Sequence, residues 1–194
     1  MSIRWNKLLV LDLDDTLIHA RSPSQAMLPW PPRRMVARYR LYLRPGAHEF
    51  VARALDRFAA VGIWTSASRD YARVMLSHFV GDLDRLAFVW SREQCEPVAP
   101  DEGHFLWHKD IARLIALGWS RERILIVDDK PEGLPGAEAN VLTMPRFEGD
   151  PSDRELIRLS AYLDRLGPLA DVTTIDKRFW WTKIALPTDP DERR

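Results

Sequence analysis

The sequence predicts an α/β fold in which helices flank a central parallel sheet. Two unbroken aliphatic runs, residues 8–11 and 124–127, each lead directly into paired aspartates. Runs of this kind are typical of strands buried on both faces, and the polar residues then lie at the strands' carboxyl ends. Strand-like and helix-like segments alternate along most of the 194 residues. That alternation indicates right-handed parallel βαβ units.

The other elements follow from periodicity and capping. Residues 34–44 have largely apolar odd positions, which predicts one strand of a small β-hairpin insertion. A capping box at 152–155 predicts the start of the last helix, which ends at Gly167. Between them we expect a helix over 47–60, a short strand within 61–68, a helix over 70–79, a strand over 86–90, a helix over 105–117 and a strand over 124–127.

Length and composition fit one domain, since 46% hydrophobic residues in 194 suffice for a core. We assign residues 1–176 to it and 177–194 to a partly disordered C-terminal tail with an aromatic anchor at 179–181. The single cysteine, Cys95, excludes an internal disulfide. With no long apolar stretch and no leader, we expect a cytoplasmic protein without membrane association. Basic and acidic residues balance at 28 each, so no global field favours nucleic acid.

The aspartates after the two aliphatic runs predict a metal site. Asp12 and Asp14 follow the first run, and Asp128 and Asp129 follow the second. Parallel strands bring these carboxylates to one sheet edge, where their mutual repulsion is relieved by a divalent cation. Mg²⁺ is the cation that such oxygen ligands suit. The alternative interpretation is an aspartate-rich turn that only caps the backbone.

Hydroxyl and lysine side chains complete the set. The short strand within 61–68 ends in hydroxyl side chains, among them Thr65 and Ser66, and Lys109 precedes the second acidic pair. A carboxylate nucleophile, a hydroxyl, a lysine and an acidic pair are the groups needed to hold and transfer a phosphoryl group. Taken singly, Thr65 is also a plausible strand end and Lys109 a plausible surface lysine. His104 and His108 have the spacing of a zinc pair but no clear third ligand, so zinc is not favoured.

These motifs resemble those of the haloacid dehalogenase (HAD) superfamily of phosphohydrolases, in the order Asp12-x-Asp14-x-Thr16, Thr65, Lys109 and Asp128-Asp129. More narrowly, the chain from residue 7 to about 172 is similar to the FCP/SCP-type phosphatases, which act on the RNA polymerase II C-terminal domain. The segments that carry this similarity are 12–19, 44–46, 64–67, 71–72, 91–95, 109–110 and 152–156. The Asp128-Asp129 pair departs from the Asp-Asn pair of many members and is commoner in other HAD branches.

The resemblance implies a HAD-like Rossmannoid fold and an aspartyl-phosphate mechanism. Asp12 is then the nucleophile and Asp14 the proton donor and acceptor. Thr65 and Lys109 bind the phosphoryl oxygens. Mg²⁺ is held by Asp12, Asp14, Asp128 and Asp129. Thr16 and Ser66 are expected on the substrate side, with Thr16 chiefly supporting Asp14.

The motif spacing predicts a site without a cap domain. Residues 17–64 and 66–108 leave no room for a sizeable inserted domain, and an open site suits a phosphate displayed on a large partner. The predicted strand over 34–44 carries Arg38, Arg40 and Arg44 on its even face. These guanidinium groups are spaced to grip a phosphorylated segment or a nucleic-acid backbone. A solvated hairpin edge protected by charge explains them equally well.

The favoured function is therefore a Mg²⁺-dependent phosphomonoester hydrolase acting on phosphoserine or phosphothreonine in protein. An alternative with the same chemistry is a phosphatase for nucleic-acid ends or small metabolites. A different class is a phosphopeptide-binding module without turnover. Retention of Asp12, Asp14 and Lys109 argues against that module, because binding alone needs no nucleophile.

Overall fold

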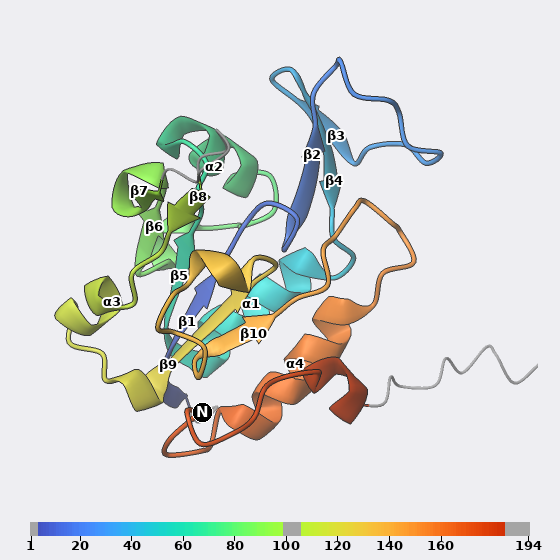
Figure 1. Cartoon of the computed structure of the whole chain (residues 1–194). Coiled ribbons are helices and arrows are strands. Elements are labelled where there is room, and N and C mark those ends of the chain that lie inside the picture. The colour runs from blue at the N-terminus through green and yellow to red at the C-terminus, as the bar shows by residue number, and fades with distance from the viewer. Residues whose placement is uncertain (1–3, 99–105, 185–194) are drawn as a thin grey trace, which may run out of the picture.

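The computed structural model describes residues 4–98 and 106–184. At its centre is a five-stranded sheet in the order β10-β9-β1-β5-β6, in which every neighbouring pair is parallel (Figure 1). The strands are β1 (Trp5–Leu11), β5 (Phe58–Trp64), β6 (Phe88–Trp90), β9 (Ile124–Asp128) and β10 (Val141–Thr143). The predicted α/β class with a central parallel sheet is confirmed.

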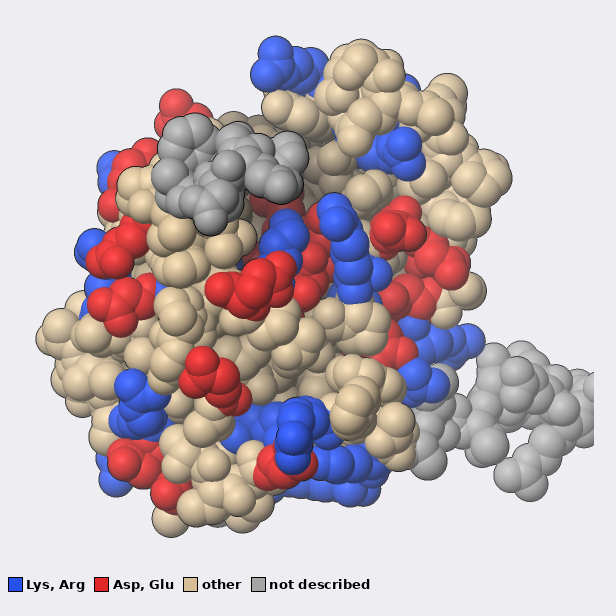
Figure 2. Space-filling model, in the orientation of Figure 1, with Lys and Arg blue, Asp and Glu red and all other residues tan. Residues whose placement is uncertain are grey.

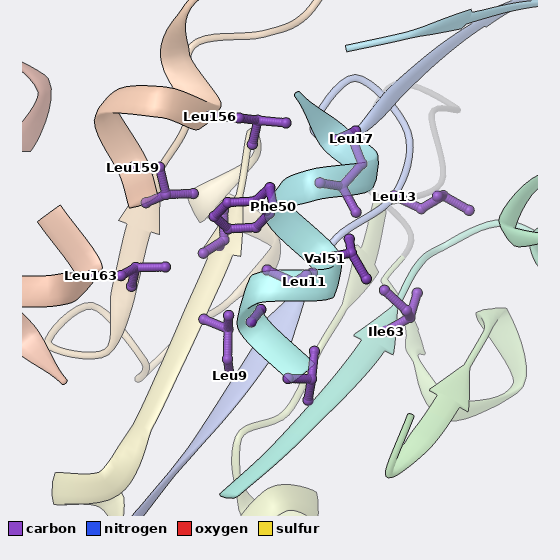
Figure 3. Close-up of a cluster of buried hydrophobic side chains, with 14 of the residues drawn as sticks. Leu9, Leu11, Leu13, Leu17, Phe50, Val51, Ile63, Leu156, Leu159 and Leu163 are labelled. Carbon is purple, nitrogen blue, oxygen red and sulfur yellow. The ribbon is translucent and has the colours of Figure 1, made fainter. Parts of the chain in front are cut away.

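Helices cover both faces of this sheet, because successive side chains of β1 point to opposite sides. Leu9 and Leu11 belong to the core that includes α1 (Ala47–Arg57), α2 (Arg69–Leu76) and α4 (Glu155–Leu166). Figure 3 shows Phe50 of α1 directed toward the leucines of α4. Leu8 and Val10 face the second core, which includes Leu114 of α3 (Ala112–Ala116). The sheet is therefore a buried central layer whose carboxyl edge positions the site.

A three-stranded antiparallel sheet follows β1 in the sequence, in the order β2-β4-β3 (Figure 1). Its strands are β2 (Ile18–Arg21), β3 (Arg34–Val36) and β4 (Tyr39–Leu43). The single strand predicted over 34–44 is wrong, since Ala37 has a φ of 49° and turns the chain. Val36 is buried and Met35 exposed, the reverse of the predicted faces. Because of this turn, the alternation of buried and exposed side chains does not continue unbroken from β3 into β4. A period of two in the sequence does not reveal such a break.

Long-range pairing accounts for the other differences from the predicted elements. The helix predicted over 47–60 ends at Arg57, because Phe58 already pairs with β1. The helix predicted over 105–117 begins instead as β8 (Leu106–His108), which pairs with β7 (Glu96–Val98). The predicted capping box is also wrong: α4 begins at Glu155, whose backbone N–H donates to Asp153 Oδ1. Short 3₁₀ turns span Leu83–Arg85, Arg92–Gln94, Arg121–Arg123, Pro131–Gly133 and Trp180–Lys183.

The chain stays packed on the domain beyond residue 176. Trp180 is fully buried, and its indole Nε1–H donates to the Thr143 carbonyl at 2.8 Å. Ile184 belongs to the same core. Part of the predicted tail therefore closes over the β10 edge, and residues 185–194 lie outside the described residues.

Candidate active site

The carboxyl ends of β1 and β9 bring Asp12 and Asp128 together. Adjacent parallel strands align these ends, and the Asp12 N–H donates to the Val127 carbonyl at 2.9 Å. The buried Lys109 ammonium lies between the two carboxylates and donates to Asp12 Oδ1 at 2.7 Å and Asp128 Oδ2 at 2.6 Å. Lys109 follows β8, and its backbone N–H donates to Gly133 in the turn after β9. These backbone hydrogen bonds therefore hold the Lys109 ammonium between the carboxylates of two neighbouring strands.

Burial dominates the electrostatics of this cluster. Burial and the nearby Asp12 charge raise the pKa of Asp128 to about 7, against the opposing effect of Lys109. The same two causes raise the pKa of Asp129 to about 6. Burial lowers the pKa of Lys109, but the charges of Asp12 and Asp128 outweigh it and the net shift is upward. The acids repel one another, and Asp12 and Asp128 share the Lys109 ammonium as a buried counter-ion.

Three of these carboxylates fit a hard divalent cation. Asp12, Asp128 and Asp129 each offer an oxygen within 4.8 Å of the others. Asp129 Oδ1 is buried and has no hydrogen-bond partner in the described part of the chain. Carboxylate oxygens are ligands that Mg²⁺ prefers, and a buried oxygen without a hydrogen-bond partner is available to bind one. The Asp14 carboxylate is not part of this group, and the contribution to the metal expected from Asp14 is its backbone carbonyl.

Asp14 has a different environment. The Tyr71 hydroxyl donates to Asp14 Oδ1 at 2.5 Å, and the Thr65 hydroxyl lies 3.4 Å from Oδ2. Burial raises the pKa of Asp14 to about 7, with Tyr71 acting in the opposite direction and Asp12 adding to the rise. This carboxyl group can thus hold or release a proton near neutral pH.

Tyr71 was not predicted as a site residue. Its hydroxyl bonds a carboxylate at the carboxyl edge of the sheet, so the face of α2 that carries Tyr71 contributes to the site as well as to the core. Tyr39 of β4 packs edge-on against the Tyr71 ring, with centroids 5.4 Å apart. The three-stranded insertion therefore contacts the site through an aromatic pair.

A pocket of about 220 Å³ opens at this cluster. Its lining residues are Asp12, Asp14, Ser66, Leu106, Trp107, Lys109, Asp128, Asp129, Lys130 and Gly133. Ser66, predicted on the substrate side, is one of these lining residues. Thr65 is 1% exposed and lies behind the pocket, where its hydroxyl accepts from the Ala67 N–H. Thr16 is fully buried, so its side chain does not reach the pocket.

The loop after β1 is held by a second charged group. Asp15 has a φ of 60°, and its carboxylate pairs with His19 Nδ1 at 2.7 Å and Arg146 at 2.5 Å. Burial raises the pKa of Asp15, but His19 and Arg146 outweigh it and lower the pKa overall. These contacts fix the backbone that follows Asp14. Of the two histidines with the spacing of a zinc pair, His108 lies in β8, and His104 is outside the described residues.

The structure separates the three arginines that the sequence grouped for substrate binding. Arg44 is fully buried, and its guanidinium donates to both Asp153 oxygens at 2.9 and 2.8 Å. It also donates to the Thr16 and Pro145 carbonyls, so it holds loops of the domain together. The prediction that Arg44 binds substrate is therefore wrong, because its guanidinium is buried and used in these contacts. Arg40 donates to the carbonyls of Ser22 and Gln25. Arg38 is exposed at the tip of the β3–β4 turn.

This placement of Arg44 predicts a stability effect. Arg44→Met leaves the Asp153 carboxylate and two carbonyls without their buried donor, so we expect the free energy of unfolding to fall by about 3 kcal/mol. Urea unfolding followed by tryptophan fluorescence measures it. The matched variant Arg38→Met, at an exposed position, should change it by less than about 0.5 kcal/mol. Equal effects of both variants would contradict the structural role of Arg44.

Comparison with known proteins places this site in a family. The family model described as NLI interacting factor-like phosphatase matches residues 7–173. The chain belongs to the NLI interacting factor-like phosphatase family.

Individual members of this phosphatase family are distant in sequence. CTD small phosphatase-like protein 2 of Dictyostelium discoideum is 27% identical over 84% of this chain and 28% of its own length. CTD nuclear envelope phosphatase 1 homolog of Drosophila melanogaster is 25% identical, over 92% of this chain and 74% of its own length. The chain spans half or less of the first three curated relatives that it matches.

Solved structures agree on the fold. A variant of the fission yeast RNA polymerase II CTD phosphatase Fcp1, bound to beryllium fluoride, superposes with a TM-score of 0.53 at 17% identity, over 87% of this chain and 52% of that one. An uncharacterized protein from Listeria monocytogenes superposes with a TM-score of 0.52 at 14% identity, over 84% of this chain and 99% of that one. These likenesses support the predicted HAD-like Rossmannoid fold.

The names of two curated relatives bear on the expected location of the protein. The cytoplasmic prediction is contradicted, because curated relatives that match this chain are named for the nuclear envelope in Drosophila melanogaster and in Schizosaccharomyces pombe. No helix within residues 4–98 and 106–184 is both long and apolar enough to cross a bilayer.

Proposed function

We propose that this chain is a Mg²⁺-dependent phosphomonoester hydrolase that works through an aspartyl phosphate on Asp12. The observation that carries the proposal is the pair Asp12 and Asp14: two carboxyl groups at one pocket with different partners. Asp12 is bonded to the Lys109 ammonium, whereas Asp14 is bonded to the Tyr71 hydroxyl. Two acids held in different environments are suited to different roles, one as nucleophile and one as proton carrier.

The first step is attack of an Asp12 oxygen on phosphorus. The bond from phosphorus to the substrate oxygen breaks, and Asp14 gives its proton to that leaving oxygen. A water then attacks the phosphorus of the aspartyl phosphate, and Asp14 accepts a proton from this water. The bond between phosphorus and the Asp12 oxygen breaks, which frees the Asp12 carboxylate and releases inorganic phosphate. The Asp14 pKa of about 7 suits both transfers.

The other residues position and neutralise charge. Lys109 lies against Asp12 and is placed to stabilise charge on the transferring phosphoryl oxygens. Thr65 lies behind Asp14 and holds the Ala67 N–H, while Ser66 lines the pocket. Asp12, Asp128 and Asp129 would hold Mg²⁺, which when bound supplies Lewis-acid stabilisation of phosphoryl oxygens.

The substrate we favour is phosphoserine or phosphothreonine within a protein. Relatives in this family are named CTD phosphatases, which supports a phosphorylated protein as the partner. The described pocket has an apolar wall of Leu106 and Trp107 beside the acids, and such a wall suits the residues that flank a phosphorylated side chain.

Phosphate release from three matched substrate panels tests this proposal. The panels are phosphopeptides, oligonucleotides with 3′- or 5′-phosphates, and small phosphometabolites, each with Mg²⁺ and with EDTA. We expect Mg²⁺-dependent release confined to phosphopeptides. Release confined to either other panel would replace the substrate class, and binding of phosphopeptides without release from any panel would favour the binding module.

The exposed Arg38 gives a prediction about large substrates. It lies beside Tyr39, with its guanidinium 5.4 Å from the ring centroid, and Tyr39 packs on Tyr71 at the site. Arg38→Glu should raise KM for a phosphopeptide about tenfold, the effect of one lost charge-assisted contact. A small aryl phosphate should be hydrolysed as by the wild type.

A charge reversal elsewhere controls for this change. Arg113→Glu, on the exposed face of α3, should leave both substrates unaffected. Equal loss on the peptide and the aryl phosphate in Arg38→Glu would instead assign Arg38 to the support of the insertion.

A further inference from the structure

The candidate active site contains an exposed cation, Lys130, that the proposed mechanism does not use. Lys130 follows Asp129 just after β9 and is one of the residues that line the pocket. It is exposed, whereas the Lys109 ammonium is buried between Asp12 and Asp128. The two lysines therefore occupy different parts of the site: Lys109 lies with the reacting groups, and Lys130 lies at the pocket mouth.

The backbone of Lys130 is fixed on both sides. Its N–H donates to Asp128 Oδ1 at 2.8 Å, and its carbonyl accepts from the Gly133 N–H at 3.0 Å. Pro131, the next residue, begins a 3₁₀ turn. The start of the side chain is therefore held at the pocket, and the flexible stem and its ammonium extend from that point.

Within residues 4–98 and 106–184, Lys130 is the one lysine whose ammonium has no acceptor. The ammonium groups of the other four lysines each donate to a carboxylate or a carbonyl, in Lys7, Lys109, Lys177 and Lys183. Asp129 Oδ1 also lacks a hydrogen-bond partner in this part of the chain, yet no ion pair joins it to Lys130. The Lys130 charge is therefore available to a group that the described chain does not supply.

The charge of Lys130 nevertheless reaches the acids of the site. Burial and the Asp12 charge raise the pKa of Asp129, and the Lys130 charge acts in the opposite direction. Burial also raises the pKa of Asp14, and the Lys130 charge again opposes the rise. Figure 2 shows basic and acidic side chains side by side near the middle of the face in view. Lys130 is thus close enough to the pocket to attract an anion that is bound there.

The size of the pocket limits what Lys130 can contact. A volume of about 220 Å³ lies below the roughly 300–1,000 Å³ of drug-sized ligand sites, so the pocket suits one phosphorylated side chain. The residues that flank this side chain then lie across the mouth, where Lys130 supplies a positive charge beside the apolar wall of Leu106 and Trp107. A carboxylate or a second phosphate is the group that such an ammonium binds best.

We propose that Lys130 selects phosphorylated segments that carry a second anionic group, an acidic side chain or another phosphate, next to the phosphorylated residue. This inference rests on the proposed function, because it names the substrate class of the same site. Lys130 contacts the flanking anion rather than the transferred phosphoryl group, for which Lys109 is the buried donor. Its effect therefore lies in the preference between substrates and not in the chemical step.

Three phosphoserine peptides of otherwise identical sequence test the proposal. They carry glutamine, glutamate or a second phosphoserine on each side of the central phosphoserine. We expect kcat/KM to be about fivefold higher for the glutamate peptide than for the isosteric glutamine peptide, the effect of one exposed ion pair. Lys130→Gln should bring this ratio to about one, and Lys130→Arg should keep it.

Fluorescence titration of Asp12→Asn with the same peptides measures binding without turnover. The Kd of the glutamate peptide should show the same preference over the glutamine peptide, and it should be lost when Lys130→Gln is added. Tighter binding of the doubly flanked phosphoserine peptide than of the glutamate peptide supports a second phosphate as the preferred group. Equal binding of these two supports any acidic flank.

The ratio between two peptides removes effects that both share. A change in the charge of the acidic cluster alters turnover of both peptides alike, so it leaves their ratio unchanged. Lys183→Gln is the matched control, because it removes an exposed lysine whose ammonium is already bonded to the Asp176 carbonyl. This variant should keep the wild-type preference.

Two results would overturn the role of Lys130. One is equal binding of the glutamate and glutamine peptides by the wild-type site, and the other is an unchanged preference in Lys130→Gln, including an equal loss on both peptides. Absence of phosphate release from every phosphopeptide would instead contradict the proposed function. The ratio of Kd values in Asp12→Asn would still decide the role of Lys130 in that case.

Discussion

Asp12→Asn should abolish turnover while leaving phosphopeptide binding within a few-fold of the wild type. An amide cannot form the acyl phosphate, so we expect kcat to fall by about 10⁴-fold or more, as for the loss of other covalent nucleophiles. Binding should survive because Ser66, Lys109 and the pocket walls remain in place. Steady-state phosphate release and fluorescence titration with a labelled phosphopeptide measure the two quantities separately.

Asp70→Asn is the matched control for that change. Asp70 is exposed in the first turn of α2, and the same substitution there should leave kcat unchanged. If Asp12→Asn hydrolysed the phosphopeptide within tenfold of the wild-type rate, Asp12 would not be the nucleophile.

Lys109→Met should affect both stability and turnover, because this ammonium is the buried counter-ion of Asp12 and Asp128. In EDTA we expect the free energy of unfolding to fall by about 3 kcal/mol, since two buried carboxylates lose their partner. Added Mg²⁺ should restore part of this loss by binding the folded state. Turnover should fall by about 10²–10³-fold with Mg²⁺ present, the effect of losing one electrostatic donor.

Urea unfolding with and without Mg²⁺ checks the stability part. Lys183→Met, at an exposed lysine near the C-terminal end of the described chain, should change neither stability nor its response to Mg²⁺. If Lys109→Met were as stable as the wild type in EDTA, the cluster would not be under the charge repulsion inferred from its geometry.

Much of this site was predictable from local sequence. Buried runs at residues 8–11 and 124–127 form adjacent strands, so Asp12 and Asp128 meet as the parallel arrangement requires. Lys109 was expected on a helix and instead follows β8, yet it reaches both aspartates. The order of chemical groups along the chain was therefore a better guide than the secondary structure assigned to each.

Other features depend on contacts far apart in the sequence. The partner of Arg44 is Asp153, 109 residues away. The sequence groups Arg44 with Arg38 and Arg40 on one strand face, but this contact makes it a buried structural residue. Tyr71 of α2 bonds Asp14, 57 residues away, and no spacing in the sequence marks that contact. The turn at Ala37 depends on a positive φ at a residue that rarely adopts one. The spacing of apolar residues along the chain predicts neither these two contacts nor this turn.

Detection of phosphate on Asp12 tests the central claim most directly. The protein is mixed with a radiolabelled phosphopeptide and Mg²⁺, quenched in acid within a single turnover, and digested for mass spectrometry. We predict protein-bound label on the peptide that contains Asp12, removed by hydroxylamine as an acyl phosphate is, and absent from Asp12→Asn. Full turnover with no label on Asp12 at any quench time would contradict the account.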